Sequence, residues 1–288
     1  MIQAVVSGLA IGGIYALLAV SFLLIYQVSG VLNFAQGEFV VIGAFVGSTA
    51  AIGWGLPVLA AGLLGVLAAG ALGLLMERVT YRPLRGKPIA TMIISTVAVG
   101  IVIARTAEII WGPEPRSMPS LVPNRPMEIL GARVSSLSLF VIVVSGLLLV
   151  VQHQLLTRTR LGRRMQATAE DSDTAQLMGI RTGRLVMVAF ALGCGLSGAA
   201  GIFVAPLFSV TLDLGFLISL KAFAACVVGG FGNLQGAAAA ALGLGVVENL
   251  AGTYIATGAK DLVAFAVLLA FLALRPQGIF GERVGEKL

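Results

Sequence analysis

Ionisable residues inside long apolar stretches are the first candidates for chemistry in this sequence. They are Glu38, Arg105, Glu108, Lys221 and Glu248. A charged side chain at the centre of a bilayer costs about 2.5–3.5 kcal/mol on insertion scales, so each of them needs a partner or a role. Arg105 and Glu108, three residues apart, share one helical face and are predicted to neutralise each other near the outer interface.

The other three residues allow two interpretations. Lys221 and Glu248 lie on successive segments late in the chain and are candidates to pair across them. Glu38 lies at the end of an apolar segment, where its side chain is expected to extend to the membrane surface. A proton relay is the alternative, but a driven pump usually carries several acids along one span, and this chain does not.

No motif for catalysis or cofactor binding is recognisable. The only Gly-Lys pair is Gly86-Lys87, and Tyr81 stands where a phosphate-binding loop needs its first glycine. The single histidine, His153, and two separated cysteines in apolar stretches give no metal-ligand spacing. Neither a Gly-x-Ser-x-Gly elbow nor a His-Glu-x-x-His pair occurs. The sequence therefore predicts a protein that is not an enzyme and holds no cofactor or metal of its own.

The elements that carry these residues are membrane-spanning helices. Of the 288 residues, 58% are hydrophobic and 11% charged, and the mean hydropathy is +1.00. The first 37 residues carry no charge, and the 38 residues from Phe39 to Met76 carry none either. A spanning helix needs roughly 20 apolar residues. These runs exclude a soluble enzyme, a DNA-binding domain and a disulfide-stapled module, and they predict an all-α polytopic membrane protein.

The chain is predicted to form a single transmembrane domain over residues 1–288. Candidate spans are 3–26, 36–53, 56–77, 89–111, 135–153, 185–206, 215–231, 234–256 and 261–275. The last three are short or interrupted by charges, so at least one of them is expected to be a short or broken helix. Eight or nine crossings follow. Glycine pairs such as Gly8 and Gly12 are expected to let helices approach closely.

Basic loops indicate the orientation. Residues 78–87 carry four basic residues, and residues 154–184 carry six Arg against three acids, so both loops are expected in the cytoplasm. Orientation also accounts for the net charge of +6, and no nucleic-acid partner is predicted. The proline-rich loop at 112–134 is expected outside. The C-terminus, with Arg275, Arg283 and Lys287, is expected inside. Nine crossings place the N-terminus outside, and eight place it inside.

The loop at 154–184 is predicted to contain two short helices. Asp173 is the expected N-cap of the second helix, and Gly179 fits the left-handed position that ends it. Its apolar residues are Ala175, Leu177, Met178 and Ile180. They are too few to enter a bilayer and either dock on a soluble partner or fold against the chain's own membrane domain.

Two similar motifs suggest an internal repeat. Asn33, Gln36 and Gly37 begin one segment, and Asn233, Gln235 and Gly236 begin another, 200 positions later. Transporters often contain repeats, with the pathway at interrupted helices between them, so these six residues are pathway candidates. Chance or plain helix capping is the alternative.

Three motifs resemble the LivH-type permease subunits of branched-chain amino acid ABC importers. They are Gly-Gly-Ile-Tyr-Ala-Leu at 12–17 with Leu-Asn-Phe-Ala-Gln-Gly-Glu at 32–38, Thr-Arg-Leu-Gly-Arg at 159–163 with Ala-x-Leu-Met-Gly-Ile at 175–180, and Gly-Gly-Phe-Gly-Asn-Leu-Gln-Gly-Ala at 229–237. They occur in family order, and the resemblance runs from about residue 8 to 278. The family often has histidine at the position of Gln36.

The resemblance implies a permease in the bacterial inner membrane that translocates hydrophobic amino acids. It implies a second, homologous permease subunit, a periplasmic substrate-binding protein and two cytoplasmic ATPase subunits that bind ATP and Mg. The residues that it assigns to coupling with the ATPases are Arg163, Asp173, Ala175, Leu177, Met178, Gly179 and Ile180. The same family includes permeases for urea and short amides. An ion-coupled secondary transporter and a passive channel are the alternatives from other classes.

Overall fold

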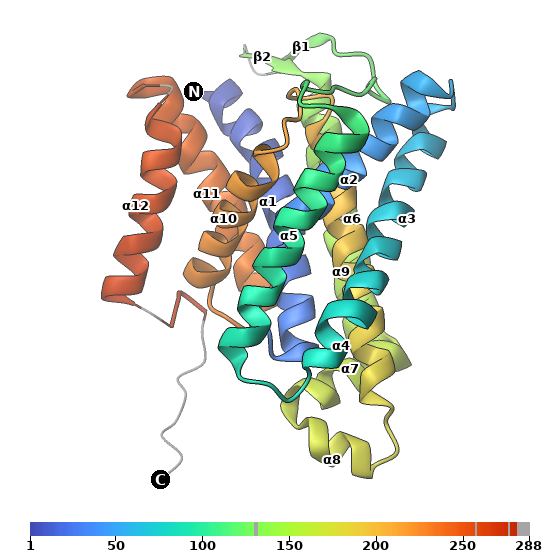
Figure 1. Cartoon of the computed structure of the whole chain (residues 1–288). Coiled ribbons are helices and arrows are strands. Elements are labelled where there is room, and N and C mark those ends of the chain that lie inside the picture. Colours follow the sequence, from blue (N-terminus) through green and yellow to red (C-terminus); the bar gives the residue numbers. More distant parts are fainter. Residues whose placement is uncertain (130–131, 257, 276, 281–288) are drawn as a thin grey trace.

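The computed structural model describes residues 1–129, 132–256, 258–275 and 277–280. It is a bundle of long helices with one small hairpin (Figure 1). In chain order the elements are α1 (Ile2–Ser29), α2 (Gln36–Ser48), a π-helical turn η1 (Thr49–Gly53), α3 (Val58–Met76), a π-helical turn η2 (Glu77–Tyr81), α4 (Arg82–Leu84), α5 (Ile89–Trp111), β1 (Pro126–Ile129), β2 (Ala132–Ser135), α6 (Ser136–Arg158), α7 (Arg160–Glu170), α8 (Ser172–Leu177), α9 (Thr182–Val204), α10 (Leu214–Gly229), α11 (Leu234–Tyr254) and α12 (Ala259–Leu274).

The all-α polytopic fold class is confirmed, and each predicted span corresponds to a helix. Within the described ranges, seven helical segments are long and apolar enough to cross a membrane. They are Ile2–Ser29, Gln36–Gly53, Val58–Leu84, Ile89–Trp111, Ser136–Arg158, Thr182–Val204 and Leu234–Tyr254. Of the last three predicted spans, α11 is long, with 21 residues, whereas α10 and α12 are short, with 16 residues each. At 1.5 Å per residue such a helix is about 24 Å long, shorter than a hydrocarbon core of roughly 30 Å.

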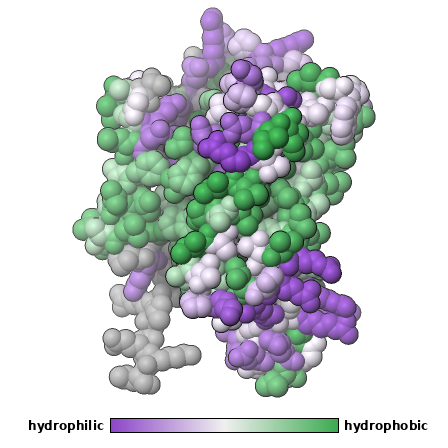
Figure 2. Space-filling view, viewed as in Figure 1, coloured by the Kyte–Doolittle hydropathy of each residue, from purple (hydrophilic) through white to green (hydrophobic). Residues whose placement is uncertain are grey.

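The surface is divided as a membrane protein requires. On the face shown in Figure 2, hydrophobic surface extends across the middle of the molecule and hydrophilic surface lies at both ends. Exposed leucine, isoleucine and valine side chains of α3, α5 and α6 contribute to the apolar surface. The β1–β2 hairpin and the N-terminus lie at one end, whereas α7 and α8 lie at the other (Figure 1). We call these the hairpin end and the α8 end.

Helix α1 runs through the centre of the bundle. It packs against α11, α9, α6 and α10, and 89% of the residues in its most apolar 18-residue stretch are buried. The expected glycine contacts are present. A Cβ atom on Gly8 would lie 2.7 Å from the Cα of Val246, and one on Gly12 would lie 2.8 Å from the Cα of Leu242, both in α11. Neither neighbour is a flexible side chain, so only glycine permits this spacing.

Replacing Gly12 with alanine should therefore separate α1 from α11. We expect Gly12→Ala to lower the free energy of unfolding by about 1–3 kcal/mol, as overpacking usually does. Gly243→Ala, in α11 with no atom within 4 Å of the new methyl group, is the matched control. It should be neutral or stabilising by up to about 1 kcal/mol, because alanine favours helix over glycine. Thermal unfolding in detergent measures both, and equal melting temperatures would contradict the packing argument.

Candidate functional site

The predicted pair of Lys221 and Glu248 exists and belongs to a larger buried cluster. Lys221 Nζ lies 2.6 Å from Oε1 of Glu248 and 2.7 Å from Oδ1 of Asp261. The hydroxyl of Tyr15 donates to Oε2 of Glu248 at 3.0 Å, and Lys221 Nζ lies 5.8 Å from the centre of the Tyr15 ring. The side chains of Lys221 and Glu248 are 9% and 6% exposed, whereas that of Asp261 is 58% exposed. The cluster joins α1, α10, α11 and α12.

The sequence did not indicate Tyr15 or Asp261 as partners. Tyr15 lies in an uncharged run of 37 residues, and Asp261 is the acid in the first turn of α12. A tyrosine inside an apolar span and an acid at the start of the next helix are visible signals. Their convergence on Lys221 depends on how three separate helices pack, which local patterns do not encode.

The other charged residues within the apolar helices differ in their exposure and in their partners. Arg105 donates to Glu108 along the exposed face of α5, as predicted, and the Arg105 side chain is 73% exposed. The prediction that Glu38 reaches the membrane surface is wrong. Glu38 is buried at 9% exposure, and its Oε2 has no hydrogen-bond partner among the residues described. The reason is that α2 begins inside the bundle, where α5 covers its first turn; a Cβ on Gly100 would lie 3.7 Å from Cγ of Glu38.

The first repeat motif forms a sealed polar network. Gln36 is fully buried. Its Nε2 donates to the hydroxyls of Ser21 at 2.8 Å and Ser197 at 2.6 Å, and its Oε1 accepts from Asn33 Nδ2 at 3.0 Å. Gly37 packs directly on the backbone of Gly215 in α10. The hydrogen bonds of Gln36 join α1, α2 and α9, and they satisfy its buried amide group, as buried polar atoms require.

The second motif lies at an open cavity instead. Asn233 caps α11, since its Oδ1 accepts from the backbone N–H of Gly236 at 2.8 Å. Gly236 packs against Gly229. Asn233 and Gln235 line a cavity of about 630 Å³ at the α8 end. Both motifs lie where a helix begins, but only Asn233 caps its helix with a side chain, since α2 has Ala35 as its N-cap without a side-chain hydrogen bond. The structure does not bring the two motifs to one cavity.

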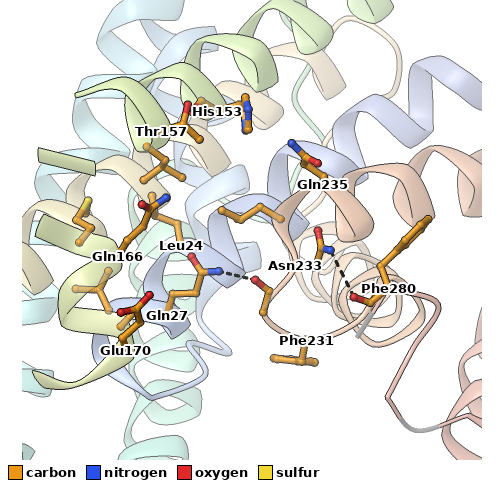
Figure 3. A pocket seen from close by; sticks show the side chains of 16 residues that line it. Leu24, Gln27, His153, Thr157, Gln166, Glu170, Phe231, Asn233, Gln235 and Phe280 are labelled. Atoms are coloured by element: carbon orange, nitrogen blue, oxygen red, sulfur yellow. Dashed lines mark hydrogen bonds between the residues drawn. The ribbon is translucent and has the colours of Figure 1, made fainter. Parts of the chain in front are cut away.

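Figure 3 shows how this cavity is lined. Side chains from the ends of α1 and α6, from α7 and from the start of α11 surround it. Its polar members include Gln27, His153, Thr157, Gln166, Glu170, Asn233 and Gln235. Gln27 Nε2 donates to the carbonyl of Gly232 at 2.6 Å and holds the loop before α11.

A second cavity continues the first one along α1. It has a volume of about 260 Å³ and shares His153, Leu156, Leu234 and Gln235 with the larger cavity. Gln152 lines it, and the buried Nε2 of Gln152 has no hydrogen-bond partner within the part of the chain that is described. The two cavities form a groove between α6 and α11 with α1 at its floor. We call it the inner groove.

The segment at the α8 end forms the two predicted short helices. The N-cap of α8 is Asp171 and not Asp173, because the Asp171 carboxylate accepts from the backbone N–H groups of Asp173 at 2.9 Å and Thr174 at 3.1 Å. The helix begins two residues earlier than expected, which places Asp173 in its first turn. Gly179 ends the helix at φ +80°, as predicted, and the N–H of Ile180 donates to the carbonyl of Ala175 at 3.0 Å.

The apolar residues of α8 separate into two groups. Leu177 is 88% and Met178 79% exposed, whereas Ala175 is buried and Ile180 half-buried against the rest of the segment. Arg163 is exposed. With Arg160, Arg164 and Ile180 it surrounds a shallow depression beside α8. The two exposed apolar side chains therefore stand at the tip of a basic region, which we call the α8 tip.

Comparisons with known proteins bear on the whole chain. The family model described as "Branched-chain amino acid transport system / permease component" matches residues 4–272. The chain is 31% identical over 300 residues to the high-affinity branched-chain amino acid transport system permease protein LivH of Escherichia coli (strain K12), covering 100% of this chain and 97% of that protein. It is 32% identical to the corresponding permease protein BraD of Pseudomonas aeruginosa, covering 100% and 98%.

More distant similarities extend over most of the chain as well. A probable branched-chain amino acid transport permease protein LivH of Methanocaldococcus jannaschii is 28% identical over 281 residues, covering 92% of this chain and 88% of that protein. Among solved structures, PsaBC from Streptococcus pneumoniae in complex with Fab is similar with a TM-score of 0.51, at 15% identity, over 96% of this chain and 91% of that chain. The structural likeness supports the fold alone.

The network around Gln36 should be required for stability. Gln36→Leu leaves the buried Asn33 amide without its acceptor and removes the donor to both serines, so we expect a loss of about 1–3 kcal/mol of unfolding free energy. Gln154→Leu, at an exposed position of α6, is the control and should change the melting temperature little. Unchanged stability of Gln36→Leu in a thermal unfolding assay would refute this role.

Proposed function

This chain belongs to the family of permease components of branched-chain amino acid transport systems, and from that premise we propose that it is one permease subunit of an ABC importer for branched-chain amino acids. The observation that carries the proposal is the family match over residues 4–272, together with full-length relatives at 31–32% identity. As a transporter permease it is not a catalytic enzyme. The proposed complex adds a second homologous permease, a periplasmic binding protein and two cytoplasmic ATPases.

We place the α8 end in the cytoplasm. The α8 end carries the basic loops, 78–87 and 154–184, and cytoplasmic loops of membrane proteins carry an excess of Lys and Arg. With α10 and α12 counted as crossings, the N-terminus then lies outside and α12 runs toward the cytoplasm (Figure 1). Arg283 and Lys287, which support a cytoplasmic C-terminus in the sequence, lie outside the described residues.

The α8 tip is the proposed contact with the ATPases. Exposed Leu177 and Met178 are too few to anchor in a bilayer, and a short amphipathic helix is a common insert for a groove on a partner protein. Arg163 and its basic neighbours provide charges around the contact. This chain has no phosphate-binding loop, so ATP and Mg bind to the partner subunits. The segment at 154–184 is then the coupling segment of a single permease domain, and the loop at 112–134 is external.

The inner groove is the proposed cytoplasmic part of the pathway. It opens at the α8 end, its polar lining consists of amides, one imidazole, the Thr157 hydroxyl and the Glu170 carboxylate, and it contains Asn233 and Gln235 of the second motif. The first motif, with Asn33, Gln36 and Gly37, instead holds α1, α2 and α9 together beside the pathway.

The main rival is an ion-coupled transporter that works alone. A proton relay needs acids with free protonation sites along the path. Glu248 is instead neutralised by Lys221, and Glu108 by Arg105, while Glu38 is buried under α5. This pattern favours energy supplied by partner subunits.

The first experiment tests contact through the α8 tip. In the double variant Leu177→Asp with Met178→Asp, two carboxylates must be desolvated at the contact, so co-purification of the ATPases should fall at least tenfold, equivalent to about 1.4 kcal/mol. The permease should still insert. Gln176→Asp, exposed on the same helix, adds a charge without removing an apolar contact and should retain the partners. Undiminished association of the double variant would remove the basis for assigning this contact.

The second experiment tests cargo and energy source together. The complex with its binding protein, reconstituted in vesicles, should accumulate L-leucine, L-isoleucine and L-valine only when ATP is supplied to the ATPase side. Uptake should persist when an ionophore collapses the proton gradient. Uptake of urea or acetamide instead would assign the chain to another branch of the family, and uptake that needs the gradient but not ATP would establish the secondary transporter.

A further inference from the structure

A separate cavity lies beside the cluster of Lys221, Glu248, Asp261 and Tyr15. It has a volume of about 280 Å³ and is enclosed by α1, α10, α11, the start of α12 and the segment after α9. The residues around it are Ile11, Ile14, Tyr15, Val204, Phe208, Leu214, Leu217, Ile218, Lys221, Glu248, Lys260 and Asp261. Val204 ends α9, and Leu214 begins α10. The cavity therefore lies toward the hairpin end, away from the inner groove.

Part of the lining of this cavity is charged. It presents two ammonium groups, from Lys221 and Lys260, two carboxylates, from Glu248 and Asp261, and the hydroxyl of Tyr15. Among the described residues Lys260 makes no ion pair, and its aliphatic chain packs against Gly252. Positive and negative groups are thus equal in number and held close together, which matches a ligand that carries both charges and no net charge.

Helix packing alone does not explain why these charges are buried. Removing a charge from water costs several kcal/mol, and a buried ion pair is often no more stabilising than apolar residues of the same volume. Elsewhere α1 and α11 meet through glycines, aliphatic residues and one neutral hydrogen bond, from the Asn249 amide to the Ala4 carbonyl. Ionisable groups inside a membrane domain therefore indicate a ligand or a pathway.

The rest of the cavity lining is apolar. Ile11, Ile14, Leu217 and Ile218 contribute aliphatic surface, and Phe208 contributes an aromatic ring. The volume lies just below the range for drug-sized small-molecule pockets, roughly 300–1,000 Å³, and therefore suits a smaller ligand. Phe208 and Asp261 are exposed at 48% and 58%, so the cavity opens to the surface beside them. A ligand with a small apolar portion and two opposite charges fits these walls.

We propose that this cavity is a subsite for a zwitterionic α-amino acid with a branched aliphatic side chain. Lys221, Lys260 and the Tyr15 hydroxyl bind the α-carboxylate, Glu248 and Asp261 bind the α-ammonium, and the aliphatic wall receives the side chain. Asp261 is the exposed carboxylate of the cluster. When the ligand binds, Asp261 releases its ion pair with Lys221 and pairs with the ammonium group of the ligand instead. The inference rests on the proposed function for its orientation, in which this end receives cargo from outside.

Cysteine protection tests the subsite directly. Phe208→Cys places a thiol in the wall, and Met127→Cys, at the same 48% exposure on β1, is the matched control. The natural Cys194 and Cys226 are buried and do not compete for reagent. In the complete complex without nucleotide, L-leucine at ten times its Kd should slow modification of Phe208→Cys by a methanethiosulfonate reagent about tenfold, by mass action. Modification of Met127→Cys should not change.

Two analogues test recognition of both charges. 4-Methylpentanoate lacks the ammonium group and 3-methylbutylamine lacks the carboxylate, so neither should protect Phe208→Cys at the same concentration. Equal protection by either analogue, or none by L-leucine, overturns the proposal.

A neutral replacement of the cluster separates binding from structure. The triple variant Tyr15→Phe, Lys221→Met and Glu248→Leu removes the buried charges together, so no charge is left buried and unpaired. It should assemble with the ATPases yet show no protection by L-leucine at position 208. Retained protection would mean that the cluster is structural only. If the triple variant does not assemble, Asp261→Asn decides, because its side chain is largely exposed; it should weaken protection at least fivefold, and unchanged protection overturns the proposal.

ATP-driven uptake measured in the same vesicles distinguishes this inference from the proposed function. Leucine uptake without protection of Phe208→Cys rejects the subsite and leaves the importer assignment intact. Absence of both uptake and protection rejects both. Uptake together with protection by L-leucine alone supports both.

Discussion

The close backbone contact between α1 and α11 is the constraint on which the rest of the bundle depends. Gly8, Gly12 and Gly245 form it, and a Cβ on Gly245 would lie 2.5 Å from the Cα of Gly12. Lipid provides no hydrophobic force between helices, so small residues that allow dense packing supply much of the association. Because α1 is fixed at the centre, α6, α9 and α10 pack around its remaining faces. The charged cavity and the inner groove then form on different faces of α1, with residues 11, 14 and 15 at one and residues 20, 24 and 27 at the other.

Two clusters of polar side chains in this bundle offset the free-energy cost of removing polar groups from water in different ways. Around Gln36 all members are neutral, and the hydroxyl and amide groups satisfy one another, so the network joins three helices without exposing a charge. Around Lys221 the members are charged and one of them, Asp261, remains largely exposed beside a cavity. A neutral, closed network is suited to holding helices together. A charged, partly open one retains capacity to bind, which is why the two are assigned different roles.

The sequence predicted the helices better than the contacts between them. Continuous apolar runs were sufficient for the helices. At least one short or broken helix was expected among the last three spans, and α10 and α12 have 16 residues each. Gly179 followed from local capping rules, but Asp171 rather than Asp173 caps α8, since adjacent acids offer the same signal. Glu38 was misplaced because burial of the first turn of α2 is decided by α5, a helix some fifty residues later. Lys221 and Glu248 were paired correctly, whereas Tyr15 and Asp261 required the packing of α1 and α12.

The position of α9 connects the α8 tip with the interior of the bundle. α9 begins at Thr182, three residues after Gly179, and packs against α1, α2 and α3. Ser197, midway along α9, bonds both Gln36 of α2 and Ser21 of α1. The chain runs from the α8 tip through residues 178–181 into α9, so α9 is the first long helix of the bundle after the tip. Its partner on α1, Ser21, lies between the residues of α1 that line the charged cavity and those that line the end of the inner groove. In the proposed importer, α9 is therefore the helix through which a movement of the α8 tip would reach α1.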